Sequence, residues 1–102
     1  PKPKTPADEL VFGRTFTDHM LVAEWDARYG WTAPEIRPFG NLSIAPSAAC
    51  LHYAVECFEG LKAYKDAEGR VRMFRPEMNV RRMQSSAQRL MLPVLISSIS
   101  FL

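Results

Sequence analysis

A helix and its start signal are contained in RMFRPEMNVRRMQSSAQRLMLP, residues 72–93. Proline is tolerated in the first turn of a helix, where its missing N–H would have had no partner, so Pro76 marks the start. Glu77 beside it suits the positive end of the helix dipole, and Pro93 prevents continuation beyond about Leu92. Apolar residues at helical spacing predict one core-facing side, made of Val80, Met83, Ala87, Leu90 and Met91.

One arginine of this helix lies beside the apolar side. Successive residues are about 100° apart around a helix, so Arg82 shares a stripe with Asn79 and Ser86, next to the central Met83. A guanidinium there could bind a phosphate or a carboxylate through two hydrogen bonds. The alternative is an arginine that packs its stem and pairs with a nearby acidic side chain. The helical pattern alone favours this structural alternative.

Two further elements are predicted before this helix. Short apolar runs at 61–64 and 71–74 flank the turn-forming stretch 66–69, whose glycine suits a positive φ, so a β-hairpin is expected. Between Ser47 and Glu59 the apolar residues again recur at helical spacing. That range begins with a serine as candidate N-cap and is followed by Gly60, so we expect a second helix there.

The N-terminal half reads as extended structure. Residues 20–25 (MLVAEW) predict a largely buried strand, closed by a turn at 26–30. Pro34 and Pro38 exclude a helix and restrict the next extended piece to an edge strand or a loop. Residues 42–44 alternate as a short strand does. The predicted fold is therefore α+β, with a mainly antiparallel sheet and two helices.

The composition is that of a small globular domain. The chain has 102 residues, 47% hydrophobic and 24% charged, with a formal net charge of +2. This length allows one domain, which we place at 10–93, between a flexible segment 1–9 and an apolar, charge-free tail 94–102. The charge is too small to indicate nucleic-acid binding, and no apolar run reaches the ~18 residues of a membrane helix. We therefore expect neither a nucleic-acid nor a membrane partner.

Few side chains have a pattern that indicates chemistry. His19 and His52 lack metal-ligand spacing, and Cys50 and Cys57 form no CxxC pair. We expect no metal site, hydrogen-bonded structural histidines, and reduced, buried thiols as in an intracellular protein. Two lysines, Lys62 and Lys65, alternate with apolar residues and should point to solvent.

Three aromatic side chains, Phe12, Tyr53 and Phe58, could line either a core or an apolar ligand pocket. Periodicity does not separate these two roles, although a core is the more common outcome.

Three segments closely resemble the N-terminal domain of branched-chain amino acid aminotransferases of the eukaryotic type. They are LVFGRTFTDHMLVAEW (10–25), SAACLHYAVECFEGLKAY (47–64) and RMFRPEMNVRRMQSSAQRLMLP (72–93). The likeness runs in order over about residues 10–93. Its pattern LHYxxxxFEGxKAY is specific to this family among pyridoxal-phosphate enzymes of the D-amino-acid-aminotransferase fold, also called fold type IV.

The resemblance implies a homodimeric pyridoxal 5'-phosphate enzyme that moves an amino group between leucine, isoleucine or valine and 2-oxoglutarate. By its motif, Arg82 looks like the arginine that holds the cofactor phosphate. Phe12, Tyr53 and Phe58 look like walls of the pocket for the branched side chain. These roles suit a guanidinium at a helix border and aromatic groups that offer aliphatic chains no hydrogen bonds.

The chain also departs from the family pattern. The family's cofactor-binding lysine lies in a larger C-terminal domain, and Lys2, Lys4, Lys62 and Lys65 do not match it. The tail 94–102 resembles nothing in the family. We therefore expect a truncated chain, cytoplasmic or mitochondrial, with no catalytic residue of its own and no activity alone. The alternative is a non-catalytic dimerisation or interaction fragment.

Overall fold

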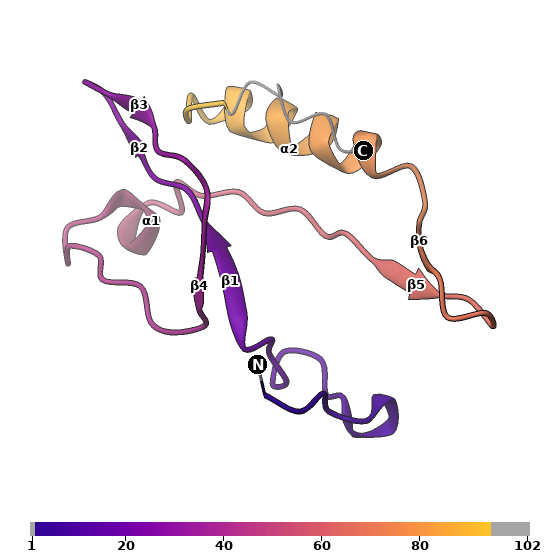
Figure 1. The fold of residues 1–102 in the computed structure, drawn as a ribbon. Coiled ribbons are helices and arrows are strands. Elements are labelled where there is room, and N and C mark those ends of the chain that lie inside the picture. The colour runs from indigo at the N-terminus through magenta and orange to yellow at the C-terminus, as the bar shows by residue number, and fades with distance from the viewer. Residues whose placement is uncertain (1, 95–102) are drawn as a thin grey trace. The chain divides into compact units, whose positions relative to one another are not determined.

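The computed structural model describes residues 2–94 of the chain (Figure 1). Within that range it contains six short strands and two α-helices, and every strand pair is antiparallel. The predicted α+β class is confirmed. The strands form three separate two-stranded ladders rather than one continuous sheet. The chain divides into two compact units, Pro1–Ile44 and Ala45–Leu102, called here the first and second unit.

The first unit holds two of the ladders. Its elements are the 3-10 turn η1 (Ala7–Glu9) and the strands β1 (His19–Val22), β2 (Trp25–Asp26), β3 (Gly30–Trp31) and β4 (Glu35–Pro38). β1 pairs with β4, and β2 pairs with β3 across the turn predicted at 26–30. That turn ends on Gly30, whose φ of +76° is open to glycine at little cost. The proline-bearing piece is an edge strand, as predicted.

Two predictions for the first unit are wrong. The strand at 20–25 is not largely buried, because Leu21 is 68% exposed and only Met20, Val22 and Ala23 are half-buried. Within the unit β1 pairs with β4 alone, and a two-stranded ladder cannot cover both of its own faces. Residues 42–44 form no strand, since they find no partner strand among the described residues.

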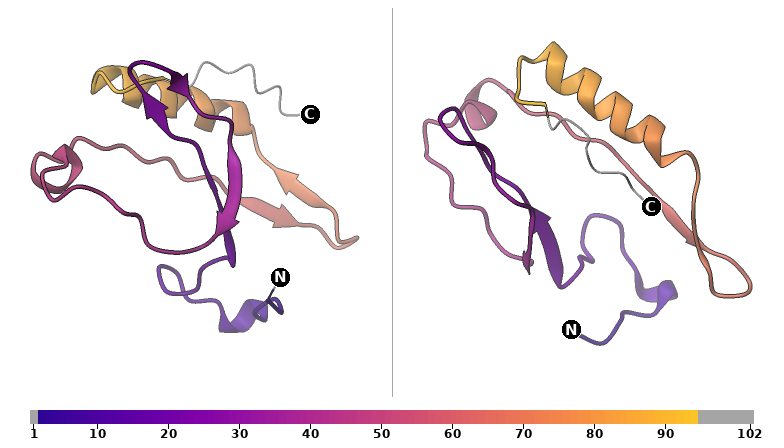
Figure 2. Two further views of the ribbon diagram at one scale, coloured as in Figure 1. Left: turned by 60° about the vertical axis from the view of Figure 1, so that its left-hand side comes forward. Right: turned by 45° about the horizontal axis from the view of Figure 1, so that its top comes forward.

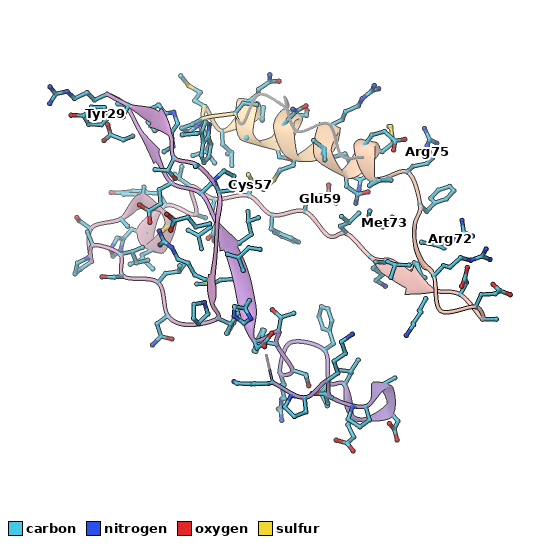
Figure 3. The ribbon with its side chains drawn as sticks, viewed as in Figure 1. Tyr29, Cys57, Glu59, Arg72, Met73 and Arg75 are labelled. Atoms are coloured by element: carbon cyan, nitrogen blue, oxygen red, sulfur yellow. The ribbon has the colours of Figure 1, made fainter. Side chains whose placement is uncertain are left out.

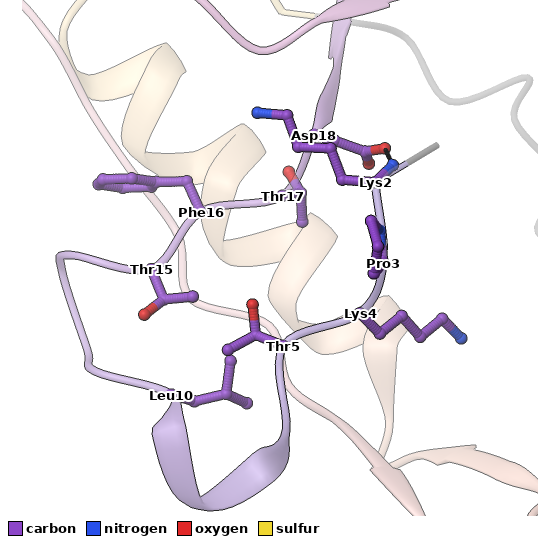
Figure 4. A pocket seen from close by; sticks show the side chains of 9 residues that line it. All are labelled: Lys2, Pro3, Lys4, Thr5, Leu10, Thr15, Phe16, Thr17 and Asp18. Carbon is purple, nitrogen blue, oxygen red and sulfur yellow. Dashed lines mark hydrogen bonds between the residues drawn. The ribbon is translucent and has the colours of Figure 1, made fainter.

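The segment before β1 folds back toward the start of that strand (Figure 4). The backbone N–H of Lys2 donates to Oδ2 of Asp18 at 2.9 Å, and Nδ1 of His19 lies 3.1 Å from Oδ1 of the same carboxylate. The hydrogen bond from Lys2, followed by the one from His19, lowers the pKa of Asp18 below its ordinary value. His19 is therefore partnered, as the sequence predicts for a structural histidine. The flexibility expected for 1–9 stays a prediction.

The second unit contains the hairpin and both helices. They are α1 (Ala49–His52), β5 (Ala63–Lys65), β6 (Val71–Met73) and α2 (Pro76–Arg89). The hairpin prediction is confirmed, and Gly69 in its turn has a φ of +80°. The long helix begins at Pro76 as predicted but ends about three residues early, at Arg89. Met91 then has a φ of +57°, which a continuing helix does not allow.

The predicted helix over 47–59 is mostly wrong. α1 has four residues, its N-cap is Ala48 without a side-chain cap, and Ala54 has a φ of +51°. From there the chain forms no regular element until β5, and Gly60 is not a left-handed helix terminator. We call residues 54–62 the extended segment. Its apolar spacing fits a helix, but the segment instead makes long-range contacts with α2, which override a local pattern.

Little of the described chain is buried. Ala87, at 8% exposed, is the only buried residue among residues 2–94, and Met83 and Leu90 on the same side of α2 remain about two-fifths exposed. The predicted apolar side is therefore only partly covered, and the prediction is wrong for Met91, which lies beyond the end of α2 and is 92% exposed. Cys50 and Cys57 are free and half-buried rather than buried, and Lys62 and Lys65 are exposed as expected.

Most of the tail 94–102 lies outside the described residues. None of the described helices is long and apolar enough to cross a bilayer.

Candidate functional site

The candidate site lies where the extended segment runs beside α2 (Figures 1 and 2). Sγ of Cys57 lies 3.7 Å from Sδ of Met83, and the carbonyl of Gly60 accepts a hydrogen bond of 2.6 Å from Nδ2 of Asn79. Later residues of the segment thus meet earlier residues of the helix, so the two run antiparallel. Figure 3 labels Cys57 and Glu59 along this segment.

An ion pair with two hydrogen bonds joins the segment to the helix. Nε of Arg82 donates to Oε2 of Glu59 at 2.9 Å, and Nη2 of Arg82 donates to Oε1 at 2.9 Å. This two-point geometry fits the planar guanidinium to a carboxylate and is stronger than a single contact. The side chain of Glu59 is 20% exposed, whereas that of Arg82 is 58% exposed. The acid is therefore the sheltered partner and the base faces solvent.

Glu59 has further support around its carboxylate. Oε1 also accepts from the backbone N–H of Gly60 at 3.0 Å and from Nδ2 of Asn79 at 3.3 Å. The hydrogen bond from Arg82 lowers the pKa of Glu59, and partial desolvation opposes this only in part. The Glu59 carboxylate in turn raises the pKa of Arg82. Both groups are therefore charged across the neutral pH range.

The Glu59 contact uses one edge of the Arg82 guanidinium. A guanidinium has five N–H donors arranged on two forked edges. Glu59 takes the edge formed by Nε and Nη2. Both hydrogens of Nη1 and the second hydrogen of Nη2 play no part in that contact. With more than half of the side chain exposed, this second edge can bind another anion.

The three aromatic candidates are all exposed. Tyr53 directly follows α1 and is 81% exposed, and Phe58 in the extended segment is 92% exposed. Phe58 borders an open groove with side chains from the last turns of α2. Phe12 belongs to the first unit and is fully exposed. Phe58 directly precedes Glu59 in the chain, and none of the three aromatic side chains is a core residue.

The sequence located Arg82 correctly at the border of the helix face but did not identify its acidic partner. The alternative of a paired structural arginine describes the observed contact, and Asn79 on the same stripe joins it. One signal in the sequence points to Glu59 as this partner. It is an acidic residue in the otherwise apolar stretch CFEGL, where an unpaired carboxylate would be unfavourable. The other histidine, His52, contacts the carbonyl of Pro46, and no metal-binding group of residues occurs in the described part of the chain.

Comparison with known proteins finds relatives that share one name, branched-chain-amino-acid aminotransferase. The chain is 60% identical over 92 residues to the cytosolic branched-chain-amino-acid aminotransferase of Saccharomyces cerevisiae, covering 90% of this chain and 24% of the relative. It is 56% identical over 93 residues to the cytosolic enzyme of Mus musculus, covering 91% and 24%. It is 53% identical over 89 residues to the enzyme of Dictyostelium discoideum, covering 87% and 24%.

The chain spans about a quarter of the length of these relatives. No family model matches it. Identity above one half across nine-tenths of the chain nevertheless exceeds any chance similarity. The chain is homologous to the branched-chain-amino-acid aminotransferases and corresponds to a short N-terminal part of them.

Proposed function

We propose that the whole protein carrying this chain is a branched-chain-amino-acid transaminase that uses pyridoxal 5'-phosphate. Its substrates would be leucine, isoleucine or valine and 2-oxoglutarate. The observation that carries this proposal is the 52–60% identity over about nine-tenths of the chain to enzymes bearing that name. Relatives named cytosolic and mitochondrial support an intracellular location, and the resemblance supports a homodimer.

In this proposal Arg82 holds the phosphate of the cofactor. The donor set fits that group, because the second edge of an exposed, permanently charged guanidinium matches the oxygen spacing of a phosphate. When bound, pyridoxal phosphate supplies an electron sink for chemistry at the α-carbon of the amino acid. The part of this chain is to bind and orient the phosphate end.

Phe12, Tyr53 and Phe58 would form walls of the substrate pocket. Their exposed rings offer a large apolar area and, apart from the tyrosine hydroxyl, no hydrogen-bonding group. Moving the aliphatic side chain of leucine, isoleucine or valine from water onto such a surface lowers the free energy, whereas moving a charged side chain there raises it.

The 102-residue chain alone would be inactive. None of its four lysines matches the family's cofactor-binding lysine, and the chain spans only a quarter of its relatives. Transaminase activity of the purified 102 residues would contradict this. So would labelling of one specific lysine after incubation with the cofactor and reduction with borohydride.

The function is tested in a chimera in which residues 10–93 replace the equivalent segment of the yeast cytosolic relative. We expect transfer of the amino group of leucine to 2-oxoglutarate. In this chimera Arg82→Ala should weaken pyridoxal phosphate affinity about ten- to a hundredfold, because a two-point charged contact is lost. Fluorescence titration of the apoenzyme measures the dissociation constant.

Arg81→Ala is the matched control. Arg81 directly precedes Arg82 in the helix, is exposed and carries the same charge. Its removal should change the dissociation constant less than about twofold, since an exposed charge that makes no direct contact with the phosphate is screened by salt. Equal effects of the two substitutions would return Arg82 to a structural role.

A second candidate function is a non-catalytic interaction fragment, favoured by the many large apolar side chains that both units expose. Co-expression of the tagged 102-residue chain with the full-length enzyme distinguishes the two. Stable copurification, with no change in activity, would favour the interaction fragment.

A further inference from the structure

We infer that Glu59 is a positioning residue for anion recognition: it fixes the guanidinium of Arg82 by one edge so that the other edge is presented to the cofactor phosphate. This inference rests on the proposed function, and it adds a residue that acts through Arg82. Its basis is the pair of 2.9 Å contacts from Nε and Nη2 of Arg82 to the two carboxylate oxygens.

The Glu59 carboxylate is itself fixed. Oε1 accepts from the backbone N–H of Gly60 and from the amide of Asn79, and the same amide holds the Gly60 carbonyl at 2.6 Å. Only 20% of the Glu59 side chain is exposed. The carboxylate is therefore held by the backbone of its own segment and by the neighbouring helix, independently of Arg82.

Arg82 would have considerable freedom without this carboxylate. An exposed arginine has four side-chain torsions, and immobilising such a side chain on binding lowers affinity. Two hydrogen bonds along one edge fix the plane of the guanidinium as well as its position. An arginine already ordered in the free protein does not lose that freedom again when the phosphate binds. Glu59 should therefore strengthen phosphate binding.

Direct charge repulsion acts against this ordering effect. Glu59 is an anion beside the phosphate position, so Coulomb's law alone predicts that removing its charge strengthens phosphate binding. The two effects have opposite signs, so a measurement can separate them. The Glu59 charge is compensated by its ion pair with Arg82, and the exposed guanidinium is screened by water, whereas ordering of the arginine acts in full. We expect the ordering effect to dominate.

The test uses Glu59→Gln in the chimeric enzyme, from which the cofactor has been removed. Glutamine keeps the size of the side chain but not the charge, and its amide nitrogen cannot accept from the guanidinium. Dissociation constants are measured for pyridoxal 5'-phosphate and for pyridoxal, which lacks the phosphate. We expect pyridoxal 5'-phosphate to bind about two- to tenfold more weakly and pyridoxal to bind unchanged.

Two further variants control the measurement. Glu56→Gln makes the same change three residues earlier, on an exposed side chain of the same segment, and should alter neither constant. In the Arg82→Ala background, Glu59→Gln should have no further effect, because its partner is gone. If Glu59→Gln does not fold, Asn79→Ala removes one donor to the same carboxylate. It should give a smaller loss that is again confined to the phosphorylated ligand.

The outcomes separate the inference from the proposed function. If Arg82→Ala weakens pyridoxal 5'-phosphate binding but Glu59→Gln leaves it unchanged or strengthens it, the positioning role is wrong and the phosphate role of Arg82 stands. An equal loss for both ligands would show that Glu59 only supports the fold, which also overturns the inference. If Arg82→Ala has no effect either, the phosphate role itself fails.

Discussion

The hairpin of β5 and β6 and the extended segment adjoin in the sequence but are held in different ways. In the hairpin, Asp66 accepts hydrogen bonds from the backbone N–H groups of Glu68 and Arg70 and from the side chains of Arg70 and Arg72. All of these partners lie within six residues of it. The extended segment is held by contacts with α2 that span 19 to 26 residues.

This contrast indicates which structure can form early and alone. A hairpin is closed by its own short turn, so the entropy cost of bringing its two strands together is small. Its contacts can therefore form early in folding. The extended segment gains none of these long-range contacts until α2 has formed. The two regions should therefore respond differently to truncation, to backbone changes and to acid.

The strongest effect should be on the solubility of the 102-residue chain alone. The extended segment and the residue before it expose Tyr53 and Phe58, so the contacts with α2 do not close an apolar core. The tail 94–102 adds an apolar, charge-free stretch without proline, which favours aggregation. Deleting 94–102 should increase the soluble fraction severalfold after centrifugation, without giving a stable monomer on gel filtration.

Deleting the charged residues 2–9 is the control and should not increase the soluble fraction. A monomer that unfolds cooperatively, obtained from the intact chain, would contradict the prediction. It would mean that the contacts between the extended segment and α2 suffice for an independent domain.

A smaller effect is expected from two glycine substitutions, one in each region. Gly69 has a φ of +80°, and a side chain there costs about 1–2 kcal/mol, while Gly60 has no positive φ and open space around it. Gly69→Ala in the chimera should therefore accelerate amide hydrogen exchange in the hairpin about tenfold. Gly60→Ala should leave exchange in the extended segment nearly unchanged. Similar effects at both positions would remove the distinction between the regions.

The same contrast explains how far the sequence could be interpreted. The hairpin and α2 were predictable because their signals, Gly69 in a turn and Pro76 at a helix start, act on residues close by. The segment 47–59 was not, because its helical spacing competes with contacts to α2 that a local pattern does not contain. For the same reason the sequence placed Arg82 at the helix border but could not supply Glu59, which lies 23 residues away.

Acid sensitivity should show the weakest effect. The pKa of Glu59 is lowered by Arg82, so its ion pair stabilises the fold fully above the ordinary value of 4.5 and is lost as pH falls through the lower folded value. For Asp66, desolvation raises the pKa, but the hydrogen bonds from Arg70 and Arg72 outweigh it. Its support is lost in the same direction, below 3.8.

Amide exchange in the chimera, corrected for its intrinsic pH dependence, measures both losses. We expect protection to fall only about two- to fivefold as each carboxylate is protonated, because the arginine of each ion pair is exposed to solvent. Glu59→Gln should remove the pH dependence from the extended segment only, and Asp66→Asn from the hairpin only. If each substitution altered the pH profiles of both regions, the two regions would be coupled.

The antiparallel contacts of the extended segment also determine where the length of the chain can change. Cys57 faces Met83 and Gly60 faces Asn79, so the short run between them is tied at both ends. One added residue in an extended chain displaces the residues after it by about 3.3 Å, more than a hydrogen bond can stretch. Insertions and deletions should therefore be rejected between 57 and 60, because they would move one end of this run out of reach of its partner on α2.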